Sequence, residues 1–474
     1  MPPLSFTPIM ANMLAARTSL DKPDLGAPGN RVDGDDLAPN FRLDVNGITV
    51  SQDISQYIES VEYESAIGMA DMLRINITNP GLVDPDWPDW NTHKVFQPSY
   101  QNEAQLSVGY GQLGHKWNFV GRVCWQKHLP RFPREGMPVL EVKGYDASVK
   151  MSHATSPIKS SRLKSKAIVS QPVGGADNLG QVFSQARHSD VVVAIAEQHA
   201  FHLDIDHTDR HEDVILKKNQ NHWEIVKGLA NLNDRDAWVD YDTQRNVWVL
   251  HWKAVQHDQK PMYVFRYGVN GTGTLLDAMP EYGLHENVTA ATILIWDGKA
   301  QQWVSVRESH SIGDEDSAES PFFTRGGGLL AKASATENPP SVRRNSNRPR
   351  RESPSHVLKR KAKDAMVHAF ENAARWRIAA GGFAIDVTVP PNRRFNDLDE
   401  ASAFLWQWFK KRQDNFITVQ GSVIGTETLR ARQTHTLLGL GDQLDGEYFF
   451  TRVRHMVAPA PYTCEFTANK VMRF

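Results

Sequence analysis

Short runs in which apolar residues alternate with polar ones are the feature that most constrains this chain. Such runs occur at residues 73–77, 106–110 and 140–142, and turn-rich stretches such as residues 79–81 separate them. A period of two places one side of a strand in a core and the other side in water. Several short strands at this spacing are typical of an antiparallel sandwich or barrel, which we expect over residues 39–155.

The last hundred residues return to the same pattern. Strand-like runs cover residues 416–420, 446–455 and 462–468. We expect them to form a second β-domain from residues 266–312 and 382–474. The whole chain is therefore expected to be α+β and mainly β.

A helix is predicted over residues 396–413, ahead of these strands. Its apolar residues fall on one face at helical spacing: Ala401, Phe404, Leu405, Trp408 and Phe409. Trp406 lies about 200° from Phe404 around such a helix. Because tryptophan is enriched at interfaces, we predict that Trp406 lies at a contact between subunits or domains; packing within one subunit is the alternative.

A small α+β domain is expected between the two β-domains, over residues 156–265. Ser189 can cap a helix, and Asn221 with Glu224 has the spacing of a capping box before a second helix. Alternating runs at residues 238–240 and 247–252 then predict a hairpin.

Two further segments lack sustained periodicity. Residues 1–38 are rich in Pro, Gly and Asp and predict an extended arm that orders against a partner. Residues 313–381 predict a flexible basic linker followed by a charged helix. Its basic run, from Arg343 to Lys363, could contact DNA, a tape-measure protein or an acidic neighbour, but no aromatic residue is interleaved to stack on single-stranded bases.

Length and charge narrow the classes of function. A chain of 474 residues has room for roughly three domains, and its net charge of −2 argues against a dedicated nucleic-acid coat, so no specific nucleic-acid partner is expected. No apolar stretch is long enough to cross a bilayer, so we expect no membrane insertion by this chain. Cys124 and Cys464, far apart in the sequence, provide neither a disulfide framework nor a zinc site and suit synthesis in a reducing cytoplasm.

The strongest candidate for a metal site is a group of imidazoles and carboxylates between residues 199 and 211: His199, His202, His207, His211, Asp204, Asp206 and Asp209. These ligand types suit zinc and similar cations. Their spacing matches no tight zinc motif. The predicted strand would place His202, Asp204 and Asp206 on a wet face, opposite the inward-facing residues Phe201, Leu203 and Ile205. We therefore predict a solvated strand face, with no metal and no cofactor.

Hydrolytic chemistry has little support in the sequence. It contains no nucleophile-elbow serine, zinc-binding helix motif or phosphate-binding loop. Cys124 lies in a strand-like context that gives no reason for a reactive thiol. Glu62 and Glu64 could share a strand face as a glycosidase pair, but a charged outer face explains them more simply. We predict no catalytic residues.

Two distant segments share a pattern. At a constant offset of 330 positions, residues 109–123 and 439–453 share Gly109 with Gly439, Gly111 with Gly441, and Arg122 with Arg452, together with a Phe and a Val. Both segments are typical of a strand, a Gly-x-Gly turn and a returning strand, because glycine adopts positive φ readily. The segments are either convergent hairpins or parts of a duplicated β-domain.

The order of several motifs resembles phage late-control D and baseplate-hub proteins. The closing hairpin carries Gly439-Leu440-Gly441, residues 444–448 and residues 453–455; the middle carries residues 189–201 and 221–230; the first β-domain carries residues 106–110, 119–123 and 143–146. The resemblance covers residues 40–265 and 395–474. It leaves the basic linker without a counterpart.

The resemblance implies a homotrimer whose subunits each carry two tube-like β-barrels. Such a ring would adapt a hexameric tail tube to a trimeric central spike in the baseplate of a contractile phage tail, as part of a virion assembled after synthesis in the host cytoplasm. The implied partners are the tail tube protein and the central spike protein, with the tape-measure protein and other baseplate proteins as further candidates. Type VI secretion spikes fuse further β-domains to a similar hub, whereas this sequence ends at Phe474, so a separate spike protein is expected.

Two other classes of function remain as alternatives. Thirteen tryptophans leave open a carbohydrate-binding or cell-wall-degrading tail protein, and the basic linker leaves open a DNA-binding factor. For the hub we predict interface residues at Trp406, at the paired glycines Gly109, Gly111, Gly439 and Gly441, and at Arg122 and Arg452.

Overall fold

A computed structural model describes most of the chain outside its N-terminal arm and basic linker. The described residues are 39–110 without 85 and 88, 117–155, 157–159, 165–167, 179–209, 211–217, 220–256, 259–268, 273–283, 290–297, 302–309, 384–387, 395, 401–402, 404–408, 412, 415–458 and 461–471. The predicted arm (1–38), the predicted linker and charged helix (313–381) and Gly111 lie outside them.

The protein is mainly β and divides into two compact units. The larger unit comprises Met1–Pro280 and Val419–Val471, and the smaller comprises Glu281–Thr418 and Met472–Phe474. Within the described residues, no helix is long and apolar enough to span a membrane.

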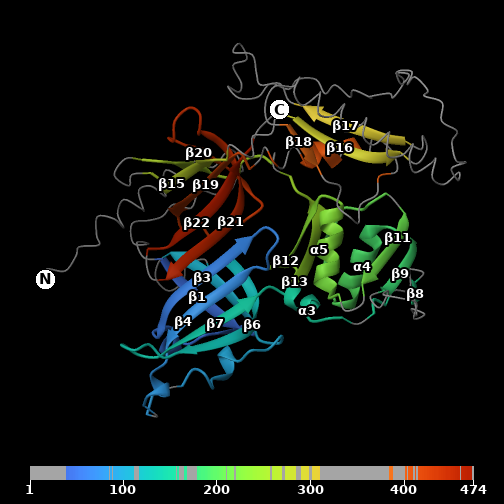
Figure 1. Cartoon of the computed structure of the whole chain (residues 1–474). Coiled ribbons are helices and arrows are strands. Elements are labelled where there is room, and N and C mark those ends of the chain that lie inside the picture. Colours follow the sequence, from blue (N-terminus) through green and yellow to red (C-terminus); the bar gives the residue numbers. More distant parts are fainter. Residues whose placement is uncertain are drawn as a thin grey trace, which may run out of the picture. The chain divides into compact units, whose positions relative to one another are not determined.

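A thirteen-stranded sheet organises the larger unit, and its first part follows the order β3-β4-β7-β6-β5-β1 (Figure 1). These strands are β1 (Pro39–Val45), β3 (Ile58–Ala66), β4 (Met72–Thr78), β5 (Glu103–Tyr110), β6 (Asn118–Arg131) and β7 (Val139–Tyr145). The short elements beside them are β2 (Ile48–Thr49), α2 (Gln52–Ser55), η1 (Pro80–Leu82) and η2 (Lys94–Phe96). Leu73, Ile75 and Ile77 are fully buried, which confirms the alternation predicted for this run.

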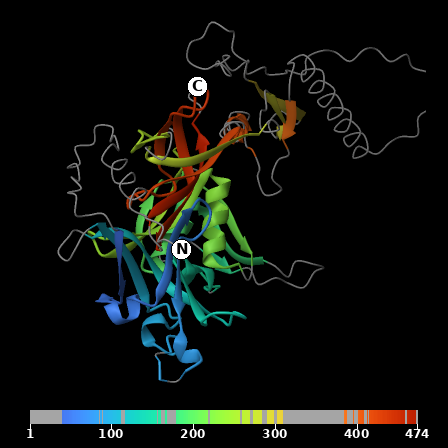
Figure 2. The ribbon, with the colours of Figure 1, turned by 90° about the vertical axis from the view of Figure 1, so that its left-hand side faces the viewer.

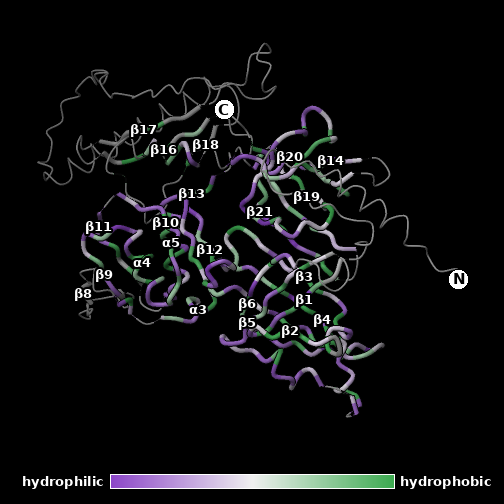
Figure 3. Tube along the Cα trace, turned by 180° about the vertical axis from the view of Figure 1, so that it is seen from behind, coloured by the Kyte–Doolittle hydropathy of each residue, from purple (hydrophilic) through white to green (hydrophobic). Residues whose placement is uncertain are grey.

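The second part of the sheet follows the order β15-β19-β22-β21-β20-β14. Its strands are β14 (Val264–Arg266), β15 (Leu275–Tyr282), β19 (Ile417–Ile424), β20 (Thr434–Leu438), β21 (Gly446–Ala458) and β22 (Thr463–Lys470). A bridge between Tyr267 and Leu275 links the end of β14 to the start of β15, so the pairing returns on itself. Hydrophobic and hydrophilic positions alternate along these strands, as a half-wet sheet requires (Figure 3).

The two parts repeat one topology. If the main strands of each part are numbered along the chain, both parts have the spatial order 2-3-6-5-4-1. Strand β6 therefore corresponds to β21, and β3 corresponds to β15. One pairing differs between the parts, because β1 is antiparallel to β5 whereas β14 is parallel to β20.

β21 joins the two parts. Its first residues pair with β20, and from Arg452 to Ala458 it pairs with β3 instead. The strand can be followed in Figure 1 and Figure 2, where red β21 runs beside blue β3. Two sets of strands that lie far apart in the sequence thereby share one ladder.

An α+β region lies between the two parts in the sequence. Its elements are α3 (Ser148–Ser152), β8 (Ser165–Ala167), β9 (Leu179–Ala186), α4 (His188–Gln198), β10 (His202–Ile205), β11 (Glu212–Lys217), α5 (His222–Leu232), β12 (Arg235–Asp242) and β13 (Val247–Ala254). They form two three-stranded sheets, β11-β9-β8 and β10-β13-β12. The two helices α4 and α5 share one apolar core with β9, β11, β12 and β13.

The helix starts test the capping predictions. The capping box of Asn221 and Glu224 is confirmed, with the Glu224 amide donating to the Asn221 side chain over 2.7 Å. The prediction for Ser189 is wrong, because α4 begins at His188 without a side-chain cap. Ser189 is instead buried inside the first turn, where its hydroxyl accepts from the Thr208 amide.

The smaller unit contains a separate three-stranded sheet, β17-β16-β18. Its strands are β16 (Ala290–Asp297), β17 (Gln302–Ser309) and β18 (Ala384–Val387). Residues 401–402, 404–408 and 412 are helical, and Ala401, Phe404 and Leu405 lie in a core with the sheet. The range predicted for the second β-domain thus contributes strands to two sheets.

Candidate functional site

The ladder between β21 and β3 carries ion pairs on the polar face of the sheet. Arg452 and Arg454 lie on β21, and Glu62 and Glu64 lie on β3. Arg452 Nε is 2.8 Å from Glu64 Oε1, and Arg454 Nη2 is 2.5 Å from Glu62 Oε2. Burial alone would lower the pKa of Arg454, but Glu62 beside it raises that pKa overall. We call this set of strands and ion pairs the β21–β3 joint.

Neighbouring strands extend the joint on both sides. Arg454 also contacts Glu465 of β22 over 3.4 Å, and Arg74 of β4 contacts Glu62 over 3.2 Å. Most of these side chains are partly shielded from water, so the alternating charges form a network rather than isolated surface pairs. The pattern selects one register, because a shift by one residue would move every side chain to the other face.

The apolar side of the joint is closed by Tyr63. Its ring lies against Gly121 of β6, where an added Cβ would be 2.1 Å from Tyr63 Cε2. The Tyr63 hydroxyl donates to Asp71 over 2.7 Å. A glycine at this position therefore allows a β3 aromatic ring to cross onto β6.

Arg432 links three elements at the edge of the joint. It lies in the loop between β19 and β20, with its backbone in the left-handed region at φ 71°. Arg432 Nε is 2.5 Å from the buried Asp236 of β12, and Nη2 donates to the Ala66 carbonyl of β3 over 3.2 Å. Its guanidinium also lies 4.8 Å from the Trp238 ring centre. One side chain thus ties the second strand set to the first and to the α+β region.

Arg430 acts in the same loop. Its Nη1 donates to the carbonyl of Glu427 over 2.7 Å, and its Nη2 donates to the carbonyls of Phe119 and Val120 on β6. Because the guanidinium donates to several backbone carbonyls, it fixes this loop against β6 without a carboxylate partner.

Two carboxyls lie near this loop, of which Asp146 is buried and Asp71 is half-buried. Asp146 accepts hydrogen bonds from the amides of Asp71 and Ser148, both over 2.7 Å. Burial raises the pKa of Asp146 to about 7, and the nearby Asp71 adds to the shift. Burial likewise raises the pKa of Asp71 to about 6, although Arg432 opposes the shift. Because both pKa values are raised, the two carboxyls are not both fully ionised near neutral pH. Two carboxylates free in solvent would be.

Glu103 connects the first strand set to the α+β region. Its carboxylate contacts Arg122 over 2.7 Å and Lys150 over 3.2 Å, and it accepts from the Trp248 indole over 3.1 Å. The Arg122 guanidinium also lies 4.1 Å from the Tyr241 ring centre. Arg122, predicted as an interface residue, thus has partners within its own chain.

The two cysteines are buried and chemically quiet. Burial raises the pKa of Cys124 and of Cys464 to about 12, so both thiols stay protonated at neutral pH. Cys464 Sγ lies 3.4 Å from His455 Nδ1, but burial, together with the nearby Arg430, lowers the pKa of His455 to about 3. This pair lacks the thiolate that a cysteine nucleophile needs.

The predicted glycines differ in conformation. Gly439 and Gly441 follow β20 with φ of 84° and 101°, as predicted for a turn. The turn prediction is wrong for Gly109, which is buried within β5 and pairs with Asn40. The two hairpins occupy matching places in the two strand sets, but single residues at the offset of 330 do not share a register.

The imidazoles and carboxylates between residues 199 and 211 turn to separate protein partners. His199 Nε2 lies 2.8 Å from His222 Nδ1, and Asp204 contacts Lys253 over 2.7 Å and His251 over 2.9 Å. In the described part of the chain, no group of three such side chains is arranged to hold a metal ion. Leu203, expected to face inward, is 39% exposed on β10.

Trp406 and Arg452, the other predicted interface residues, are half-buried and exposed, respectively. The residues that sequence reasoning missed are Arg430, Arg432 and Asp236. Their contacts join segments about two hundred or more positions apart, and no local motif marks such partners.

The chain shares its fold with solved tail proteins. The tail protein from Neisseria meningitidis MC58 superposes with a TM-score of 0.52 at 9% identity, covering 91% of this chain and 97% of that one. The 43 kDa tail protein of prophage MuSo2 from Shewanella oneidensis gives a TM-score of 0.51 at 10% identity, covering 91% and 98%. No protein-family model matches the chain, and no curated protein matches its sequence. The resemblance to phage tail proteins is thus confirmed at the level of the fold.

Proposed function

We propose that this chain is a structural subunit of a phage tail baseplate, in which three copies form a hub ring between tail tube and central spike. The observation that carries the proposal is the repeated strand order of the two halves of the large sheet. The fold shared with two tail proteins over most of both chains supports a tail component.

The repeat addresses a mismatch of symmetry. A six-fold tube cannot dock evenly on a three-fold spike unless an adaptor offers six similar surfaces on one side. A trimer of chains that each carry two similar strand sets offers six such surfaces. The other side of the ring is free to differ between the two sets and to keep three-fold symmetry.

Each strand set would serve as one tube-like barrel. The returning pairing of β14 and β15 supports this for the second set, and the shared strand order extends it to the first. The β21–β3 joint would then hold two adjacent barrels of the ring at a fixed angle. In this role the chain works by shape and needs no catalytic residue.

The proposed partners are the tail tube protein on one side and the spike protein on the other. The tape-measure protein and other baseplate proteins are further candidates, and the site of action is the baseplate of the virion. Trp406 remains a predicted contact with a subunit or domain.

The proposal is tested by mixing the purified full-length chain with polymerised tail tube protein of the same phage and imaging by electron microscopy. We expect the chain to cap one end of the tubes. Failure to bind tubes, together with co-sedimentation with insoluble peptidoglycan, would instead support the carbohydrate-binding alternative.

A further inference from the structure

The β21–β3 joint has an unpaired counterpart elsewhere in the same chain. By the shared strand order, β6 corresponds to β21, and β15 corresponds to β3. Within one chain β21 pairs with β3, whereas β6 and β15 pair with other strands. The repeated topology therefore contains one joint that forms within the chain, between β21 and β3. Its counterpart, between β6 and β15, does not form within the chain among the described strands.

The segment of β6 that would form the second joint corresponds to the segment of β21 that pairs with β3. β6 pairs with β5 only as far as Cys124, and from Lys127 to Arg131 its one partner among the described strands is β7. Its register against β7 shifts between Trp125 and Lys127, just as the register of β21 against β22 shifts between Phe450 and Arg452. In β21 the segment after this shift is the one that binds β3.

On β15, the second joint would use the edge of the strand that faces away from β19. After the bridge at Leu275, β19 is the one strand that β15 neighbours in the described part of the chain. Asp277, Met279 and Glu281 alternate along β15 and are exposed, with Met279 67% exposed. Asp277 accepts from the Ser422 hydroxyl of β19 over 2.6 Å, which places this row of side chains on the same face as Ser422.

The charges of these two segments repeat those of the joint. In the β21–β3 joint, arginines on the long strand meet glutamates on the shorter one. The free segment of β6 offers the exposed Lys127, together with Arg131, which already pairs with Glu141 of its own chain over 2.5 Å, and β15 offers Asp277 and Glu281. Between the charges lie exposed apolar residues, Leu129 at 38% on β6 and Met279 on β15. An edge that is basic and apolar thus has a complement that is acidic and apolar.

We propose that β6 of one copy pairs with β15 of the next copy, so that the β21–β3 joint is repeated between chains. This inference rests on the proposed hub ring and names its interface. The contact is heterologous, and it generates a closed ring when the rotation between copies is 120°. Pro130 and Pro280 cannot donate to a ladder, so the paired segment is short and side-chain contacts supply much of its stability.

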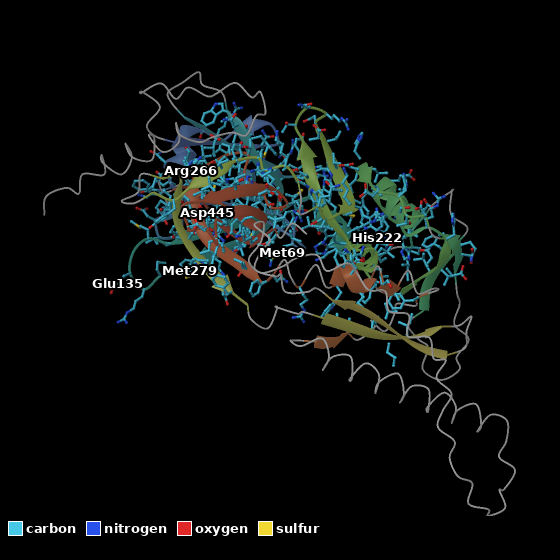
Figure 4. All side chains as sticks on the ribbon, turned by 90° about the horizontal axis from the view of Figure 1, so that it is seen from above. Met69, Glu135, His222, Arg266, Met279 and Asp445 are labelled. Carbon is cyan, nitrogen blue, oxygen red and sulfur yellow. The ribbon has the colours of Figure 1, made fainter. Side chains whose placement is uncertain are left out.

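Figure 4 shows how the β6 edge is presented. Glu135, in the turn between β6 and β7, lies at the tip of a ribbon that projects beyond the surrounding side chains. This turn lies outside β6 and provides matched control positions.

The experiment uses the full-length chain and light scattering after size exclusion. The β6-edge variant is Lys127→Glu with Leu129→Glu, and the β15-edge variant is Asp277→Lys with Met279→Lys. We expect wild type to be a trimer and each variant to be a monomer at tenfold higher concentration. The control, Arg134→Glu with Met137→Glu on the turn, makes the same change of net charge as the β6-edge variant but outside the edge, and is expected to remain a trimer.

Mixing the two variants tests the head-to-tail geometry. Each retains one intact edge, and the two altered edges carry opposite charges, so an equimolar mixture is expected to associate where neither variant alone does. A wild-type trimer whose two edge variants also remain trimers would refute the joint and leave the proposed hub standing. A wild type that is monomeric at all concentrations would contradict both.

If the charge-altered edge variants do not fold, a disulfide cross-linking experiment tests the same pairing. Leu129→Cys and Met279→Cys leave the charges unchanged, and the native cysteines are buried. Under oxidation, a mixture of the two single variants is expected to give a disulfide-linked dimer of chains, and neither variant alone is expected to do so. Trimers that form without this cross-link would overturn the proposed pairing.

Discussion

His435 is a polar side chain within the apolar core of the second strand set. It is fully buried among the rings of Tyr263, Phe265 and Phe450. Among the atoms that the structure describes, neither ring nitrogen has a hydrogen-bond partner. A buried polar group without a partner costs about 1–3 kcal/mol.

Replacing this imidazole should stabilise the protein. We expect His435→Leu to raise the free energy of unfolding by about 1 kcal/mol at pH 7, because an apolar side chain of similar size carries no unmet hydrogen bond. Burial lowers the pKa of His435 to about 3. The unfolded chain therefore binds the proton more readily, and wild-type stability is lost as pH falls from 6.5 towards 3.

Chemical denaturation at several pH values measures both effects. The advantage of the His435→Leu variant over wild type should widen as the solution is acidified. A variant less stable than wild type at pH 7, with an unchanged pH profile, would show that the imidazole has a partner in solution.

Two glycines give opposite predictions for one substitution. We expect Gly121→Ala to destabilise by about 1–3 kcal/mol, because the new Cβ would overlap the Tyr63 ring. Gly228 lies within α5 with open space around its Cα, so Gly228→Ala should stabilise by about 0.5–1 kcal/mol. Thermal unfolding of both variants checks the contrast, and equal effects would show that the Tyr63 ring moves aside freely.

Among the structural elements, the loop between β19 and β20 carries the clearest energetic prediction. Arg432→Ala should cost about 3–5 kcal/mol, because it leaves the buried Asp236 carboxylate without its cation. Arg432→Lys should recover little, because a point charge cannot contact Asp236, the Ala66 carbonyl and the Trp238 ring together.

A double-mutant cycle with Asp236→Ala separates the pair from other losses. Strong coupling between the two substitutions is expected, so that the double variant is less destabilised than the sum of the single ones. Additive costs would show that the contact between Arg432 and Asp236 does not hold the strand sets together.

Asp71, half-buried beside Arg432, predicts a pH dependence opposite to that of His435. Its pKa is raised to about 6, so the folded state binds its proton more tightly than the unfolded state. The resulting cost to stability is present above pH 6 and disappears as pH falls towards 4. Asp71→Asn should therefore stabilise at pH 8 and have little effect near pH 4. Denaturation curves at both pH values decide, and strong destabilisation at pH 8 would show that Arg432 needs the Asp71 charge.

The sequence predicted elements better than the contacts between them. Local alternation located β4, β5, β7, β19, β21 and β22, and a capping box located the start of α5. Glu62 and Glu64 share one strand face with charged partners, but Glu62 is buried rather than on an exposed outer face, and their arginine partners are not local. Arg452 lies 388 positions from Glu64, and only the register of the folded sheet brings them together.

For the whole molecule, the duplicated hairpin was visible in the sequence but its exact register was not. Gly-x-Gly spacing suggested two equivalent turns, yet Gly109 is part of a strand and Gly439 is in a turn. Topology preserves the repeat more faithfully than residue identity, because a strand order tolerates shifts and bulges that destroy a fixed offset. The junction around Arg432 and Asp71 had no counterpart in any sequence motif.

The proposed hub consists of three chains, each with two similar strand sets, that form one ring. A three-dimensional reconstruction of the purified full-length protein by electron microscopy tests it most directly. We expect a three-fold ring around a central channel, with six similar lobes and β6 of each chain beside β15 of the next. A stable monomer or dimer, or a ring whose two strand sets occupy dissimilar environments, would contradict it.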